Sequence, residues 1–200
     1  MASNSPKVFS IDGVIPVIHP TAFVDSTAVV IGDVVIGANC YIGPNVSLRG
    51  DMAAIEIGEG SNIQDNCTLH CMTGIPTIVG EWGHIGHGAV VHSARLEKNV
   101  LVGMNAVVMD ESVVGENSVV AAMAFVKTGM KIPENSLVAG VPARVIRSLK
   151  PEEIEWKRDG TRCYHELVER CKASLEAVDA LTEKENNRPS LQVSMIDKKA

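Results

Sequence analysis

Aliphatic residues recur at every sixth position along most of this chain. The members of this ladder are Val24, Val30, Ile36, Ile42, Leu48, then Ile57, Ile63, Leu69, then Val79, Ile85, Val91, and finally Leu96, Val102, Val108, Val114, Val120 and Val126. A period of six matches neither the α-helix, which repeats every 3.6 residues, nor the alternation of a half-buried strand. Six residues as a short strand plus a corner, repeated three times per turn, make a triangular solenoid with its aliphatic residues inside. The ladder therefore predicts an all-β fold, a parallel β-helix.

Helical periodicity replaces the ladder near the C-terminus. Pro151 opens a helical pattern, and Glu152 and Glu153 suit its first turn. We expect Gly160 to end this helix and a second helix to run over residues 161–180, packed along the β-helix. The predicted organisation is a β-helix domain over residues 1–147, C-terminal α-helices over 148–182 and a polar tail over 183–200.

The composition excludes several classes of protein. Among 200 residues, 46% are hydrophobic and 4% are aromatic, so the core is built from aliphatic side chains. The net charge of −6 is the opposite of a nucleic-acid-binding footprint. No apolar run is long enough to span a membrane, and the N-terminal residues lack the apolar segment of a signal peptide. The five cysteines form no CxxC pair, which favours free thiols in the cytoplasm.

Three of the six histidines lie within residues 84–92. With roughly 18 residues per turn and turns stacked about 4.8 Å apart, Leu69 and Val91 occupy the same face in successive turns. His70 and His92 each follow one of these residues directly. We therefore expect them to be stacked neighbours that point outward from one edge of the solenoid.

His87 follows the ladder by two residues and lies on a different face from His70 and His92. A neighbouring copy, packed side by side, can bring its own His87 to their edge. These placements predict a homotrimer with its sites between subunits. Three imidazole nitrogens with one position open form the ligand set of a catalytic metal. Zinc is the expected metal, and three imidazoles also suit iron or cobalt.

Several motifs together resemble the gamma-class carbonic anhydrase family. The matching stretches are Arg49-Gly50-Asp51, Asn62-Ile63-Gln64-Asp65-Asn66 with His70, and His87-Gly88-Ala89-Val90-Val91-His92. The stretches Gly83-His84-Ile85-Gly86-His87, Val120-Ala121-Ala122-Met123 and Glu185-Asn186-Asn187-Arg188-Pro189 resemble its bacterial phenylacetate-degradation and carnitine-operon branch. The resemblance implies a left-handed coil, against the usual right-handed crossover.

The resemblance also implies roles for individual residues. It assigns the metal ligands His70, His87 and His92 and the catalytic set Gln64, Arg49, Asp51 and Asp65. Gln64 would hold a metal-bound water or hydroxide. The three charged residues of the catalytic set would form ion pairs at the trimer interface.

Two departures from the family bear on the reaction. Met52 follows the Arg-x-Asp motif, and the loop after His70 has no carboxylate, where the family prototype carries glutamates for proton transfer. Carbon dioxide hydration needs that proton carried away, so efficient hydration is in doubt. We therefore predict a metal-dependent hydrolase or lyase, whose metal-bound hydroxide attacks an acyl-CoA thioester or CO2.

Two alternatives belong to other functional classes. Hexapeptide acyltransferases share the β-helix, use one histidine as a general base and need no metal, and Gly140-Val141-Pro142-Ala143 resembles a stretch near their CoA groove. The second alternative is a non-catalytic trimeric partner protein in an acyl-CoA pathway, such as carnitine or phenylacetate metabolism. The expected partners are further copies of the chain and a small-molecule substrate, an acyl-CoA thioester or CO2/bicarbonate, with neither nucleic acid nor membrane.

Overall fold

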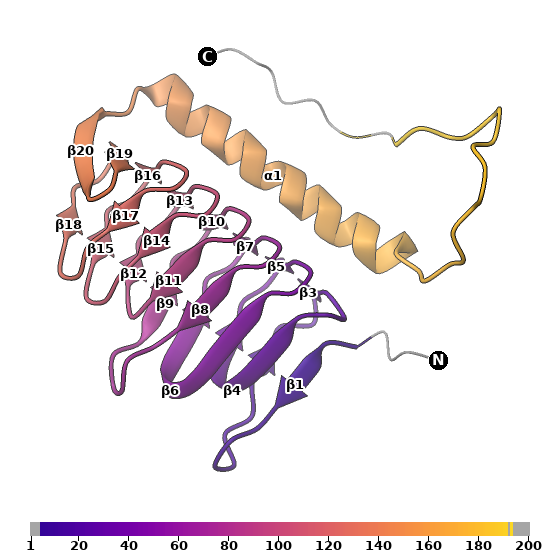
Figure 1. Ribbon diagram of the computed structural model, residues 1–200, viewed down its shortest axis with the longest axis horizontal. Helices are drawn as coiled ribbons and strands as arrows, with labels where there is room; N and C mark the ends of the chain where they lie inside the picture. The colour runs from indigo at the N-terminus through magenta and orange to yellow at the C-terminus, as the bar shows by residue number, and fades with distance from the viewer. Residues whose placement is uncertain (1–4, 192, 194–200) are drawn as a thin grey trace.

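A computed structural model describes residues 5–191 and residue 193 as a solenoid of short strands followed by one long helix (Figure 1). Nearly all strands pair in parallel with strands one turn away, so each turn advances the coil by one strand spacing of about 4.8 Å. The architecture is a left-handed parallel β-helix of about seven turns. It confirms the fold class that the ladder and the resemblance predicted.

Most of the strands span only two or three residues. They are β1 (Lys7–Phe9), β2 (Val17–Ile18), β3 (Phe23–Val24), β4 (Val29–Ile36), β5 (Tyr41–Ile42), β6 (Ser47–Ile57), β7 (Asn62–Ile63), β8 (Thr68–His70), β9 (Thr77–Val79), β10 (His84–Ile85), β11 (Val90–His92), β12 (Arg95–Leu96), β13 (Leu101–Val102), β14 (Val107–Val108), β15 (Val113–Val114), β16 (Val119–Val120), β17 (Phe125–Val126), β18 (Lys131–Ile132), β19 (Ser136–Gly140) and β20 (Ala143–Ser148).

The strands form the three faces of a triangular prism. One face continues from β6 through β8, β11 and β14 to β17, and a second from β6 through β9, β12 and β15 to β18. The third runs from β3 through β5, β7, β10, β13 and β16 to β19. The antiparallel pair β19–β20 ends the third face.

The ladder residues fill the interior of the prism. From Val30 to Val126 each is at most 2% exposed, and the small residues Ala28, Cys40 and Ala89 fill the corners beside them. Full burial of one aliphatic side chain of this size contributes about 1.5–3 kcal/mol. The core therefore rests on many small, equivalent contributions, as the low aromatic content predicted.

Asparagines occupy several of the corners. Asn99, Asn117 and Asn135 have φ angles of 58°, 59° and 54°, a left-handed conformation that asparagine tolerates better than most residues. Their side chains form a ladder along the axis, with amide-to-carbonyl distances of 2.7 and 3.0 Å. The backbone conformation and the side-chain bonds therefore favour the same residue at these corners.

The helix α1 (Pro151–Ser174) lies along the β3–β19 face (Figure 1). The prediction of a helix break at Gly160 is wrong, because α1 continues through it. A Cβ atom at Gly160 would lie 4.0 Å from Cε1 of His84, so the helix backbone approaches the solenoid closely there. The predicted second helix is also wrong beyond residue 174, because residues 175–191 contain no helix. Part of the predicted polar tail, residues 192 and 194–200, lies outside the described residues.

Lys157 anchors α1 to the solenoid. Its side chain is buried, and its ammonium group donates to the Trp82 carbonyl at 2.5 Å and to Asn99 Oδ1 at 2.6 Å. Burial without a carboxylate partner lowers the pKa of Lys157 to about 7. Over the described residues, α1 is the only helix, and it is not apolar enough to cross a membrane.

Candidate functional site

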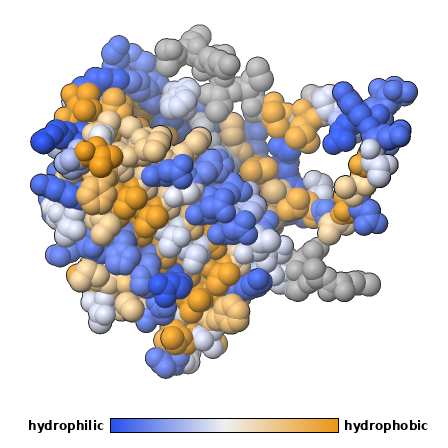
Figure 2. Space-filling model, viewed as in Figure 1, coloured by the Kyte–Doolittle hydropathy of each residue, from blue (hydrophilic) through white to orange (hydrophobic). Residues whose placement is uncertain are grey.

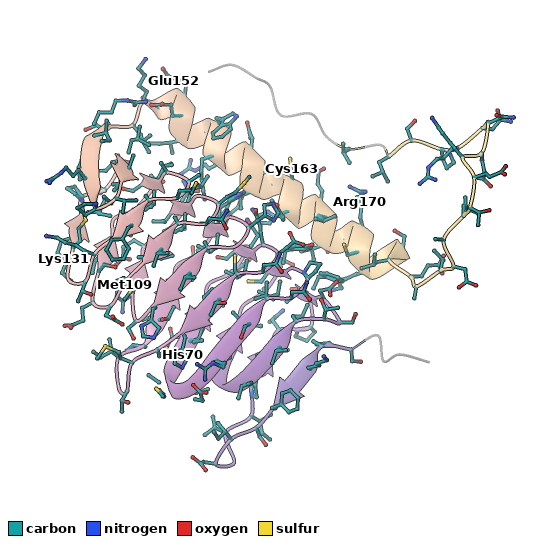
Figure 3. All side chains as sticks on the ribbon, in the orientation of Figure 1. His70, Met109, Lys131, Glu152, Cys163 and Arg170 are labelled. Atoms are coloured by element: carbon teal, nitrogen blue, oxygen red, sulfur yellow. The ribbon has the colours of Figure 1, made fainter. Side chains whose placement is uncertain are left out.

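His70 and His92 stand side by side on the β6–β17 face. Strands β8 and β11 pair in parallel with His70 opposite His92. Nδ1 of His70 lies 3.1 Å from Nε2 of His92, and the ring centroids are 5.1 Å apart. The stacking expected of these two residues is observed, and we call the pair the histidine edge. His70 lies on the strand side of the molecule, away from α1 (Figure 3).

Carboxylates hold both ends of the histidine edge. Asp51 Oδ1 lies 2.9 Å from His70 Nε2, and Asp110 Oδ1 lies 2.5 Å from His92 Nδ1. Arg49 donates to the other oxygen of Asp51 at 2.7 Å. Burial alone would raise the pKa of Asp51, but the hydrogen bond from His70 and the charge of Arg49 bring it below its usual value.

Asp110 is a site residue that the sequence reasoning missed. It follows His92 by 18 residues, and His70 precedes His92 by 22 across the inserted loop after β8. One turn of this coil is about 18 residues, so a search for polar residues one turn above His92 would have found it. Its carboxylate fixes the orientation of the His92 ring.

His87 occupies the corner between the β3–β19 face and the β6–β17 face. Its Nδ1 lies 2.6 Å from Asp65 Oδ2, and the two side chains are 43% and 37% exposed. Among the described residues, its Nε2 has no hydrogen-bond partner. His87 lies in the turn before β11 and His92 ends that strand, and five residues of chain span at most about 16 Å. Within the described residues of one chain, the three predicted metal ligands do not meet.

The three charged residues predicted for the trimer interface also have partners within the chain. Arg49 pairs with Asp51, and Asp65 pairs with His87. Consistent with this division, no group of three or more His, Cys, Asp or Glu side chains converges on one point within residues 5–191 and 193. One chain therefore carries two separate clusters, the histidine edge and the Asp65–His87 pair, which are the two half-sites of the predicted shared site.

Gln64 lies in a buried polar network beneath α1. Its Nε2 donates to Asn62 Oδ1 at 2.9 Å and contacts His84 Nε2 at 2.8 Å. The His84 ring also packs edge-on against Tyr164 of α1, with centroids 5.4 Å apart. Burial, together with the charge of Lys157, lowers the pKa of His84 to about 3. Sequence reasoning had no means of predicting this network, because α1 meets His84 across more than seventy positions.

A cavity lies at the C-terminal end of the β6–β17 face. It has a volume of about 440 Å³ and is lined by Lys127, Met130, Pro142, Ala143, Arg144 and Val145. Lys127 follows the ladder residue Val126 as His92 follows Val91, and Val126 is two strands further along the face. This places Lys127 about 10 Å along the axis from the histidine edge. Among the described residues, neither Lys127 nor Arg144 has an ion-pair partner. On the face between, hydrophobic and hydrophilic side chains are interspersed (Figure 2).

Comparison with known proteins gives consistent results. Residues 15–50 match the family model described as bacterial transferase hexapeptide (six repeats). The carnitine operon protein CaiE of Escherichia coli strain K12 is 50% identical over 184 residues, covering 92% of this chain and 94% of that protein. The protein of the same name from strain O157:H7 is 52% identical over the same length.

Two solved structures resemble the whole solenoid. A Bacillus cereus protein, described as a candidate acetyltransferase, is 33% identical with a TM-score of 0.84, covering 86% of this chain and 99% of that one. A hexapeptide transferase family protein from Anaplasma phagocytophilum is 37% identical with a TM-score of 0.79, covering 82% and 96%.

These comparisons overturn the predicted enzyme class. The similar solved structures are described as transferases, not as metal-dependent hydrolases or lyases, so that prediction is wrong. The predicted role of Gln64 in holding a metal-bound water or hydroxide stays a prediction. Its amide hydrogens are directed to Asn62 and His84, which leaves its carbonyl oxygen for such a contact. The histidine spacing identifies a site but does not specify the reaction.

Proposed function

Because this chain belongs to the hexapeptide-repeat family, with carnitine operon protein CaiE as a relative at 50% identity, we propose that it is an acyltransferase using acyl-CoA. The observation that carries the proposal is the Asp65–His87 pair. A histidine with one nitrogen held by a carboxylate and the other open to solvent has the geometry of a general base. His87 is arranged in this way, with 2.6 Å between Nδ1 and the carboxylate.

Asp65 fixes the proton of His87 on Nδ1, so that Nε2 is free to accept one. Nε2 removes the proton of a hydroxyl or amine acceptor, whose oxygen or nitrogen attacks the thioester carbonyl. Collapse of the tetrahedral intermediate breaks the carbon–sulfur bond, and the thiolate of CoA takes the proton from His87. The products are the acylated acceptor and free CoA.

The CoA moiety is proposed to lie along the β6–β17 face. Lys127 and Arg144, without ion-pair partners among the described residues, are placed to bind its phosphates at the cavity of about 440 Å³. The thioester end then points toward the histidine edge. In a homotrimer, a neighbouring chain would bring its His87 to that edge, so each site would be shared between two chains.

The test is acyl transfer followed by mass spectrometry, because the free cysteines of the protein would react with thiol reagents. Acetyl-CoA is the first donor and carnitine the first hydroxyl acceptor, chosen from the name of the relatives. We expect His87→Asn to lower the rate on the order of 10²–10⁴-fold, as for loss of a general base. His19→Asn, which changes an exposed histidine elsewhere on the solenoid, is the matched control and should retain full activity.

Retention of transfer by His87→Asn would refute the proposed base. If the wild-type chain transfers no acyl group to any hydroxyl or amine acceptor, the acyltransferase proposal fails. The non-catalytic reading, a partner in an acyl-CoA pathway, would then be preferred. It is favoured by the fact that the relatives are named for an operon and not for a reaction.

A bound metal remains a second proposal for the same residues. The atoms fit: His70 Nδ1 and His92 Nε2 are 3.1 Å apart, close to the roughly 3.3 Å between two nitrogens on one tetrahedral zinc. Carboxylates orient His70, His92 and His87 through their other nitrogens, as is usual for metal-binding histidines. Zinc, iron or cobalt would be held by the histidine edge and a neighbour's His87, and would supply polarisation of a thioester carbonyl.

Metal analysis of the purified protein separates the two proposals. The metal proposal expects about one equivalent per chain, lost in His70→Ala, His87→Ala and His92→Ala alike. The general-base proposal expects transfer that is insensitive to chelators. Activity that disappears with the metal and returns with it would refute the metal-free form of the mechanism.

A further inference from the structure

His84 is the histidine that the proposed reaction does not use. It lies on β10, covered by α1, with its ring against Tyr164 and its Nδ1 3.3 Å from Thr161 Oγ1. Its Nε2 is 2.8 Å from Gln64 Nε2. His84 therefore connects α1 to the turn that carries Gln64 and Asp65.

The contacts of His84 indicate which ring nitrogen carries the proton. A neutral imidazole has one donor and one acceptor, and burial keeps His84 neutral by lowering its pKa to about 3. The Gln64 amide nitrogen, 2.8 Å away, can only donate, so Nε2 is the acceptor and the proton is on Nδ1. Thr161 Oγ1 at 3.3 Å accepts this proton, and the Asn62 amide nitrogen, 3.2 Å from the same Nδ1, makes no hydrogen bond with it in this tautomer. The Thr161 hydroxyl in turn donates to the Lys157 carbonyl at 3.3 Å.

This arrangement determines what Gln64 can offer a ligand. One amide hydrogen is donated to Asn62 Oδ1 at 2.9 Å and the other to His84 Nε2. An amide side chain has only two such hydrogens, so the carbonyl oxygen is the group left for a ligand. Gln64 directly precedes Asp65, whose carboxylate holds His87.

We propose that His84 is a positioning residue, which holds Gln64 as a hydrogen-bond acceptor beside the Asp65–His87 pair. The site then selects acyl acceptors that carry an N–H or O–H donor in addition to the group that is acylated. This inference rests on the proposed acyl transfer, because it assigns the specificity of that same site.

Kinetics of His84→Phe test the inference. Phenylalanine keeps a ring against Tyr164 but removes both hydrogen-bonding nitrogens. We expect the KM for the acceptor to rise about ten-fold, the effect of about one hydrogen bond. The kcat and the KM for acyl-CoA should change little. His84→Gln, whose carbonyl oxygen can replace Nε2 as acceptor, should recover most of the loss.

Tyr164→Phe is the matched control, because it keeps the ring contact and the covering of His84. It should leave both kinetic constants near their wild-type values. Thr161→Val is a milder second variant in case His84→Phe does not fold. It removes the hydroxyl that accepts the Nδ1 proton of His84. The KM for the acyl-acceptor substrate should therefore rise, as in His84→Phe.

A readout independent of activity comes from the amide of Gln64 itself. The chain has two glutamines, Gln64 and Gln192, so selective ¹⁵N-glutamine labelling gives two side-chain amide signals, and Gln192→Glu assigns them. We expect slow hydrogen exchange of the Gln64 amide in the wild-type protein. In His84→Phe, at least one of its protons should exchange ten-fold faster or more.

The outcomes separate the inference from the proposed function. Unchanged acceptor KM in folded, active His84→Phe overturns the inference and leaves the acyltransferase proposal standing. If the wild-type chain transfers no acyl group, the proposed function fails, and the exchange experiment still decides whether His84 fixes Gln64. Unchanged exchange of the Gln64 amide in His84→Phe overturns the inference by itself.

Discussion

Four histidines of this protein, His70, His84, His87 and His92, differ in the groups that hydrogen-bond to their ring nitrogens. Asp51, Asp65 and Asp110 hold His70, His87 and His92, and a carboxylate at that position fixes both the tautomer and the ring orientation. His84 has instead the amides of Gln64 and Asn62 and the hydroxyl of Thr161 beside it, and it is covered by α1. The same residue type is therefore a candidate reactive group at three positions and a structural one at the fourth.

At this scale we predict a pH dependence of stability that belongs to His84. Its pKa is about 3 in the folded protein, against an ordinary value of 6.5, so below pH 6.5 the unfolded chain binds a proton that the folded chain does not. Stability should fall as the pH drops from 7.5 to 5.5, by roughly 1 kcal/mol from this residue. Urea unfolding at both pH values, at equal protein concentration, measures it. An equally steep loss in His84→Phe would show that other groups cause it.

At the scale of elements, α1 covers the β3–β19 face of the solenoid and is anchored to it by buried side chains. Lys157 binds the corner carbonyl of Trp82 and the end of the asparagine ladder at Asn99, and Tyr164 covers His84. The two-residue strands β7 and β10 cannot bury a polar network by themselves, because without a covering element their outward-facing side chains would be exposed to solvent. The helix supplies the second wall, so the Gln64 network exists only while α1 is docked.

The anchor leads to a second prediction, for alkaline pH. Burial lowers the pKa of Lys157 from 10.5 to about 7, so between these values the unfolded chain binds more protons than the folded one. Stability should therefore rise from pH 7 to 8.5, by on the order of 1.5 kcal/mol from Lys157. Lys157→Met, which fills similar volume without a charge, should remove this rise. A variant whose unfolding free energy follows the wild-type pH profile would contradict the assignment.

At the scale of the whole molecule, we predict that one chain carries an incomplete site. The histidine edge and the Asp65–His87 pair lie at opposite ends of one side of the triangle, and no cluster of three possible metal ligands joins them within the described residues. A closed cyclic assembly can bring unlike patches together in each of its interfaces. We expect light scattering to give a mass about three times the chain mass of 21.3 kDa.

Mixed assemblies test the shared site directly. His87→Ala and His92→Ala chains should each be inactive alone. After they are unfolded together and reassembled in equal amounts, about one interface in four pairs an intact histidine edge with an intact His87. Acyl transfer, or metal content if metal is bound, should therefore return to about a quarter of the wild-type value. No recovery in verified mixed trimers would mean that the two half-sites do not cooperate.

Much of the architecture could be predicted from local pattern. The ladder from Val30 to Val126 specified the coil, because the same six-residue unit is buried in the same way in every turn. The register that stacks His70 on His92 followed from that periodicity. Even Asp110, which was missed, lies at the expected interval of one turn above His92.

The sequence by itself therefore determined the β-helix and the positions of the chemical groups along its faces, since in a solenoid contacts are set by a constant repeat. Only the tertiary structure decided the course of α1 through Gly160 and the partners of Gln64 and His84. Those contacts join segments that no period relates, and they depend on how closely a helix backbone approaches the strands. The reaction class was mispredicted for a related reason. A set of histidines at fixed spacing is compatible with several reactions, and the protons and neighbours that distinguish them are placed by packing.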